Sequence, residues 1–329
     1  MLLEHLNLFG CSDLKFTSED INFLKSLTKL DYLNLSYCKQ LEEFSFPASL
    51  RELDFHNTSL RELTDNIGQL SKLRKMLIAH VLLTACRPLL EICLPSDLEI
   101  KLCKKLECLP NSLENLSSLT NITISCCPEL QRLPDSLGDL SSFTNLQIVY
   151  CNNLERLPDS LGDLSSLTNL SIKGCPKLER QGVKSLPKSI RQLNNLQELN
   201  LSMCPISELD FGAASLSNLK KIYLGETEVC RISFSEDSCP HLESLGIFEN
   251  KHLEEIEALP KTLQTIVLVL SEMLKSIPSL AGFTSLRGFC LRGCDGIEKI
   301  EGLEGCTSLQ VLKAEFEEAA TQRKQGISY

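Results

Sequence analysis

Cysteine is the residue type in this sequence that offers the most varied chemistry. The chain has 329 residues and 16 cysteines, and a cysteine thiolate can bind zinc, form a disulfide or act as a nucleophile. Zinc sites are usually built from C-x-x-C pairs, and the sequence contains none. Instead, Cys103, Cys127, Cys151 and Cys175 follow one another at intervals of 24 residues. Such regular spacing favours a structural role, and we expect no metal site.

Eight cysteines share one position in a recurring frame, apolar-x-x-apolar-x-apolar-x-x-Cys/Asn-x-x-apolar. A side chain at that position must be small enough to fit beneath a turn. Asn bonds the neighbouring backbone well there, and Cys does so more weakly. Cys290 lies outside this position, between two apolar residues, and a reactive thiol on an open surface is the alternative for it. We interpret the eight as a structural ladder of Cys11, Cys38, Cys103, Cys127, Cys151, Cys175, Cys204 and Cys294.

Histidines and paired carboxylates could supply acid–base or cation chemistry. The five histidines form no recognisable constellation with a Ser or Cys and an acid, so we predict no catalytic residue and no enzyme. The segment PDSLGD pairs Asp135 with Asp139 and recurs with Asp159 and Asp163. Stacked carboxylates could chelate a cation, but a solvated face with capping acids is the favoured interpretation. We expect no cofactor.

The residues around the ladder repeat almost letter for letter. The run RLPDSLGDLSSFTNL at Arg132–Leu146 recurs 24 residues later as RLPDSLGDLSSLTNL, with Phe143 replaced by Leu167 as the single difference. The frame fits about 14 stretches, spaced by about 19 to 29 residues. A period of this size indicates a solenoid of similar structural units.

Each unit is expected to contain one short strand and one return segment. In SSLTNLSIKGC, Leu170 and Ile172 alternate with the polar Asn169 and Lys173, so one strand face is buried and the other open. The segment LPDSLGDL starts with proline and contains Gly138, which limits it to a short 3₁₀ or α turn. Stacked units would share one core and one parallel sheet, which makes the fold class α/β.

The unit L-x-x-L-x-L-x-x-C-x-x-L-x-x-L-P-x-S-L-G-x-L resembles the leucine-rich repeats of plant intracellular nucleotide-binding disease resistance proteins. CPELQRLPDSLGDLSSF and CNNLERLPDSLGDLSSL carry the resemblance best. It implies a horseshoe with a parallel β-sheet on the concave face and short 3₁₀ or α turns on the convex face. We expect a solenoid of about 14 repeats over residues 1–314 and a C-terminal cap or tail over 315–329. The motif G-x-x-x-x-G-K-[ST] is absent, so we expect an excised portion of a larger receptor or a truncated relative.

The outward residues of the strands form the expected binding surface. Four of the five tyrosines fall on or beside this face, and Tyr and Arg are frequent interface anchors. The alternative is that strands simply favour aromatic residues. The predicted protein-binding residues are Tyr32, Tyr37, His56, Tyr150, Lys173, Tyr223, Phe248 and Arg292.

Composition limits the remaining functions. The net charge of −10 and the pI near 5.2 give no basic surface for nucleic acid. Neither a signal peptide nor an uninterrupted apolar span is evident, so we expect no membrane association and a location in the cytoplasm or nucleus. The resemblance implies a recognition module of an innate immune receptor. Such a module binds a pathogen effector or a modified host protein and holds an adjoining nucleotide-binding domain inactive. The alternative is a generic leucine-rich-repeat adaptor or the substrate-receptor scaffold of a ubiquitin ligase.

Overall fold

The structure, a computed structural model, divides the chain into two compact units. Unit 1 comprises Met1–Leu178 and Pro187–Leu193, and unit 2 comprises Glu179–Leu186 and Asn194–Tyr329. The predicted cap or tail over 315–329 lies outside the described residues, except for residue 315. The described residues are 2–41, 46–58, 70, 72–80, 95–109, 111, 113, 117–178, 188–211, 216–235 and 238–315.

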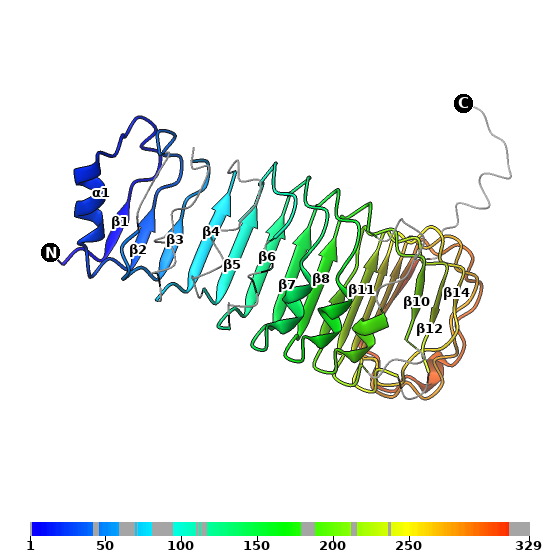
Figure 1. The fold of residues 1–329 in the computed structure, drawn as a ribbon. Helices are drawn as coiled ribbons and strands as arrows, with labels where there is room; N and C mark the ends of the chain where they lie inside the picture. Colours follow the sequence, from blue (N-terminus) through cyan, green and yellow to red (C-terminus); the bar gives the residue numbers. More distant parts are fainter. Residues whose placement is uncertain are drawn as a thin grey trace, which may run out of the picture. The chain divides into compact units, whose positions relative to one another are not determined.

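Unit 1 is built on a parallel sheet whose strands follow the order of the chain (Figure 1). Paired strands align without offset: Ile124 lies opposite Ile148, which lies opposite Ile172. Equivalent residues of successive repeats therefore stack on one another. The strands are β1 (His5–Asn7), β2 (Tyr32–Asn34), β3 (Glu52–Asp54), β4 (Lys75–Ala79), β5 (Asp97–Lys101), β6 (Asn121–Ser125), β7 (Asn145–Val149) and β8 (Asn169–Lys173).

Unit 2 has the same repeat pattern on parallel strands that pair in chain order. These are β9 (Glu198–Asn200), β11 (Lys221–Gly225), β13 (Ser244–Phe248), β15 (Thr265–Val269), β16 (Gly288–Arg292) and β17 (Val311–Glu315). The predicted fold class, a leucine-rich-repeat solenoid with a parallel sheet on one side, is confirmed.

A second sheet on the return side of unit 2 was not predicted. It contains the short parallel strands β10 (Glu208–Asp210), β12 (Arg231–Ser233) and β14 (Glu255–Ile256). Their central apolar residues Leu209, Ile232 and Ile256 are buried. The same place in the repeats of unit 1 has isolated parallel bridges, Cys108 to Arg132 and Arg132 to Arg156. The short strands of unit 2 are a longer form of this pairing.

The core is formed by the inward half of every strand. In β7, Leu146 and Ile148 are buried, whereas Asn145, Gln147 and Val149 remain partly exposed. Burying one such aliphatic side chain stabilises the fold by about 1.5–3 kcal/mol. We call the other side of the sheet, the one predicted to be concave, the open face.

The predicted short turns of the return side are 3₁₀ helices in unit 1. They are η4 (Asp135–Asp139), η5 (Asp159–Asp163) and η6 (Lys188–Gln192). The sequence suggested that Gly138 in η4 only limits helix length. The structure shows a steric reason for the glycine as well, because a Cβ there would lie 2.4 Å from the carbonyl oxygen of Ser160. The glycine therefore lets η4 and η5 pack closely.

A helix near β1 was also not predicted. Helix α1 (Ser18–Lys25) lies beside β1 (Figure 1) and begins with a capping box. Thr17 Oγ1 accepts from the Asp20 backbone N–H at 3.2 Å, and Asp20 Oδ2 accepts from the Thr17 N–H at 2.9 Å. The hydrogen bonds from Thr17 lower the pKa of Asp20 below its ordinary value. Leu24 is the helix residue that the fold buries.

Candidate protein-recognition site

The predicted binding residues all lie on strands or within three residues after a strand. Tyr32, Lys173, Tyr223, Phe248 and Arg292 belong to strands. The other three, which follow a strand, are Tyr37, His56 and Tyr150. The structure brings Tyr37 together with His56, and Tyr223 together with Phe248.

A left-handed backbone position sets the direction of the residues that follow each strand. Tyr37 has φ 63° and Tyr150 has φ 55°, a conformation that costs a non-glycine residue about 1–2 kcal/mol. The backbone N–H of Tyr37 donates to His56 O at 2.8 Å, and that of Tyr150 donates to Lys173 O at 2.8 Å. The bond to the next repeat offsets the strain. The same position is left-handed at Asn57, His80, Leu102, Cys126, Met203, Glu226, Glu249 and Leu270.

Three rings gather at the strand ends of β1, β2 and β3. The centroids of Phe9 and Tyr37 are 5.1 Å apart, and those of Tyr37 and His56 are 5.0 Å apart, both edge to face. Phe9 and Tyr37 are exposed, whereas His56 is half-buried. We call Phe9, Tyr37 and His56 the aromatic cluster. It unites two of the predicted binding residues.

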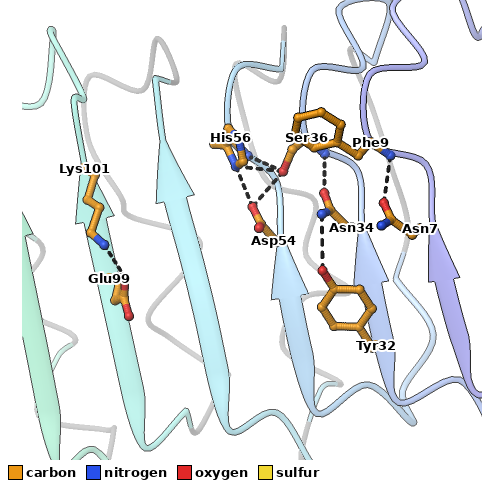
Figure 2. Close-up of polar contacts among 9 residues, drawn as sticks. All are labelled: Asn7, Phe9, Tyr32, Asn34, Ser36, Asp54, His56, Glu99 and Lys101. Atoms are coloured by element: carbon orange, nitrogen blue, oxygen red, sulfur yellow. Dashed lines mark hydrogen bonds and ion pairs between the residues drawn. The ribbon is translucent and has the colours of Figure 1, made fainter.

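A polar network fixes one carboxylate beside the aromatic cluster (Figure 2). Ser36 Oγ donates to Asp54 Oδ1 at 2.7 Å, and His56 Nδ1 lies 2.8 Å from the same oxygen. Ser36 is fully buried, and the Asp54 side chain is 20% exposed. The network therefore holds a partly exposed carboxylate in one orientation.

Ser36, His56 and Asp54 do not form a catalytic triad, although the three residue types suggest one. In a triad the serine and the carboxylate bind opposite nitrogens of the imidazole. Here Ser36 Oγ lies 2.8 Å from His56 Nδ1, the nitrogen that Asp54 also contacts. In a triad, His56 would accept the serine proton on one nitrogen while the carboxylate binds the other. Ser36 and Asp54 share one nitrogen here, so His56 cannot act in that way. The arrangement orients Asp54 instead of activating Ser36.

Tyr32 is tied to the same region by the side chain of Asn34 (Figure 2). Asn34 Nδ2 donates to Tyr32 Oη at 3.2 Å, and Asn34 Oδ1 accepts from the Ser36 N–H at 2.9 Å. Asn34 occupies an outward-facing position of β2, but it is only 7% exposed because these contacts cover it. It belongs to the support of the open face rather than to its accessible surface.

In unit 2, the structure brings Tyr223 and Phe248 together over a glycine. A Cβ added at Gly246 would lie 2.8 Å from Phe248 Cε2 and 3.0 Å from Tyr223 Cδ1. The two rings therefore use the space above Gly246. Tyr150 is accommodated similarly in unit 1, since a Cβ at Gly174 would lie 2.4 Å from Tyr150 Cδ1. Sequence reasoning missed both glycines; the signal was a glycine one repeat after an outward aromatic residue.

The cysteines of the ladder lie where the frame placed them, at the corner after each strand. Cys11 is half-buried and the other seven are buried. Their thiols make weak contacts with backbone carbonyls, such as Cys38 Sγ to Leu8 O at 3.3 Å and Cys151 Sγ to Val149 O at 3.9 Å. Contact with the Cys127 side chain and burial raise the pKa of Cys151. Burial also raises the pKa of Cys38 and Cys294, so these thiols stay protonated at neutral pH.

Four of the described cysteines outside the ladder are accessible to different degrees. Cys108, Cys126 and Cys290 are half-buried, and Cys230, which the sequence reasoning did not single out, is exposed. Within the described ranges, no group of three or more His, Cys, Asp or Glu side chains is arranged to hold a metal ion. No helix among the described residues is long and apolar enough to span a membrane.

Comparison with known proteins shows a related sequence that matches about a third of the chain. No family model matches the chain. A stretch of 121 residues, 36% of this chain, is 33% identical to the disease resistance protein RPS4B of Arabidopsis thaliana. That stretch spans 8% of RPS4B, so the similarity concerns a small part of that protein.

Three of the solved structures with the same fold are bacterial proteins. The internalin InlF of Listeria monocytogenes superposes with a TM-score of 0.60 at 17% identity, covering 96% of this chain and 88% of that one. A leucine-rich-repeat protein of Leptospira interrogans gives 0.56 at 18% identity, covering 98% and 93%. InlJ of Listeria monocytogenes, whose functional domain includes a cysteine ladder, gives 0.54 at 17% identity, covering 94% and 66%.

These similarities and the fold define the class of the protein: it is a leucine-rich-repeat solenoid. Within that class, the repeats resemble those of plant nucleotide-binding disease resistance proteins, as the match to RPS4B supports.

Proposed function

We propose that the chain is a non-enzymatic protein-recognition module of a plant-type innate immune receptor. Leucine-rich-repeat solenoids are typically interaction scaffolds. The 33% identity to a disease resistance protein over 121 residues supports the immune role. Nothing in the proposed activity requires a cofactor.

The observation that carries the proposal is the set of aromatic side chains on the open face. Tyr150 is 44% exposed, Phe248 37% and Tyr37 36%, while the inward aliphatic residues of the same strands are buried. Large apolar side chains that stay exposed on a fixed scaffold are typical of interfaces. Here the left-handed corners and the glycines beneath the rings hold them in place before any partner binds.

The proposed ligand is a pathogen effector or a modified host protein. In the parent receptor, located in the cytoplasm or nucleus, the same module would pack against a nucleotide-binding domain and hold it inactive. A ligand that binds the open face more tightly in the active state would shift the equilibrium toward activation. The net charge of −10 argues against nucleic acid as the ligand.

Proximity labelling with the full-length parent protein in plant cells tests this function. The parent should carry a nucleotide-binding domain, and the labelled proteins should include one that binds the purified chain directly. That interaction should be lost when Tyr150 and Tyr223 are both replaced by alanine. A parent without a nucleotide-binding domain would contradict the immune role and favour the adaptor alternative.

A further inference from the structure

The ends of β1, β2 and β3 combine exposed rings with the oriented carboxylate of Asp54. We propose that this place, formed by Phe9, Tyr37, Glu52, Asp54 and His56, binds an arginine side chain of the protein partner. We call these five residues the arginine corner. This inference rests on the proposed function, because it specifies the chemistry of the partner.

The rings provide a stacking surface. Phe9 is 56% exposed and Tyr37 36%, and their edge-to-face contact at 5.1 Å keeps both in a defined orientation. The ring of Phe9 is 6.1 Å from that of His56, so the three side chains support one another. A guanidinium group stacks on such aromatic surfaces through cation–π attraction.

Asp54 provides an oriented hydrogen-bond acceptor. Its Oδ1 is occupied by Ser36 Oγ at 2.7 Å and His56 Nδ1 at 2.8 Å. Its Oδ2 has no partner among the described residues, and the side chain keeps 20% of its accessible surface. The carboxylate is therefore fixed by one oxygen and retains the other for a donor from outside.

The charge balance around β3 favours a cation. Glu52 is exposed on the same face of β3 as Asp54 and forms no ion pair with the described residues. Two strands further along, Glu99 is neutralised by Lys101 at 2.6 Å (Figure 2) and approached by Lys75 at 3.8 Å. Lys75 is the register partner of Glu52 on β4, but its ammonium pairs with Glu99, so Glu52 keeps no ion-pair partner among the described residues.

Arginine fits this combination better than lysine. Its planar guanidinium stacks on a ring while its N–H groups donate in the same plane to a carboxylate. A lysine ammonium is a compact, strongly hydrated charge and gains less from the rings. The partner is accordingly a protein segment that presents an arginine to the open face.

The test uses the full 329-residue chain and three synthetic peptides. The peptides share the sequence Gly-Gly-X-Gly-Gly, with arginine, lysine or citrulline at X, and binding is followed by saturation-transfer NMR. The arginine peptide should bind at least about 3-fold more tightly than the lysine peptide. The citrulline peptide, whose side chain has the shape of arginine without its charge, should bind at least about 10-fold more weakly than the arginine peptide.

Variants assign the binding to the corner. Tyr37→Leu and Phe9→Leu should each weaken the arginine peptide about 3- to 10-fold, and Glu52→Gln should weaken it without changing the melting temperature. Leu270→Ala is the control: Leu270 occupies the same left-handed position and is 43% exposed, but β15 and β16 contain no acidic residue. That variant should bind the peptide like the unmodified chain.

Equal binding of the three peptides, or an equal loss in Tyr37→Leu and Leu270→Ala, overturns the arginine corner. The outcome is separable from that of the proposed function, because the peptides report the corner whatever the biological partner is. A corner that binds the arginine peptide, in a chain whose parent has no nucleotide-binding domain, would leave this inference standing and remove the immune role.

Discussion

At the scale of single residues, the repeat position of the cysteine ladder shows how much one side chain can contribute to the stability of the fold. In one repeat of unit 2 that position holds Asn250, which is 1% exposed. Its Oδ1 accepts from the N–H of Thr227 at 2.8 Å and from its hydroxyl at 2.5 Å. Its Nδ2 donates to Leu224 O at 2.8 Å and to Phe248 O at 3.3 Å. A ladder cysteine such as Cys151 has one weak contact, at 3.9 Å, with a carbonyl.

Replacing these two residues should therefore have unequal costs. Asn250→Ala leaves buried backbone groups and Thr227 without partners and should lower the free energy of unfolding by about 3 kcal/mol. Cys151→Ala removes mainly packing and should lower it by about 1 kcal/mol. Urea unfolding followed by circular dichroism measures both. Equal losses would show that the hydrogen bonds of Asn250 add nothing to the stability of the corner.

Buried thiols should make the stability of the chain fall in alkaline solution. Burial raises the pKa of Cys239 from 9.0 to about 12. Below pH 9 the thiol is protonated in both states; above it, the unfolded chain loses a proton that the folded chain keeps. Unfolding is then favoured by up to about 1.4 kcal/mol for each pH unit until the folded pKa is reached.

The variant Cys239→Ala tests this pH dependence. The decline in the free energy of unfolding between about pH 9 and pH 11 should be shallower in Cys239→Ala than in the unmodified chain. Cys230→Ala, which removes an exposed thiol, serves as the control and should keep the original slope. A slope unchanged by Cys239→Ala would show that this thiol ionises alike in both states.

The sequence predicted which residues point outward, but not which of them meet. Alternation along each strand places Tyr37, Tyr150 and Tyr223 on or beside the open face. Their grouping depends on register and on left-handed corners, which no single repeat reveals. Gly246 makes room for two rings from neighbouring positions, and its role becomes visible only when the repeats are stacked.

At the scale of elements, close packing of the 3₁₀ turns determines what η4 can contain. Gly138→Ala should lower the free energy of unfolding by about 1–3 kcal/mol, because the new Cβ would meet the Ser160 carbonyl at 2.4 Å. Helix propensity alone predicts the opposite sign. Gly288→Ala is the control: its Cβ would be 3.7 Å from the nearest atom, a Thr265 side-chain carbon, so it should be neutral or stabilising. Equal melting temperatures for Gly138→Ala and the unmodified chain would contradict the packing argument.

The strands were predictable as elements, whereas α1 and the second sheet were not. Strands follow from a frame that recurs in almost every repeat, since each unit must bury the same apolar face. The return segments of β10, β12 and β14 and the segment of α1 lack the repeated LPDSLGDL text of η4 and η5, so no period identifies them. Helix α1 depends on the local capping box of Thr17 and Asp20, and β12 is supported by ion pairs from Arg231 to Glu255 at 3.1 Å and to Glu257 at 3.2 Å.

At the scale of the whole molecule, repetition and variation have separate roles. The nearly identical return segments, such as those of η4 and η5, build the scaffold through close packing. The strand residues that differ between repeats form the open face, where the aromatic side chains and the arginine corner lie. Both units carry such a surface on their own strands, so each can be tested by substitutions of its own.

The most direct test of the central claim is the affinity of the open face for its protein ligand. The dissociation constant of the ligand identified by proximity labelling should be measured for the unmodified chain, Tyr150→Ala and Tyr223→Ala. Each substitution should weaken binding by about 10-fold or more with an unchanged melting temperature, and Asp159→Ala on η5 should leave binding as it was. Unchanged affinity in both tyrosine variants, or loss of binding only together with loss of fold, would contradict the account.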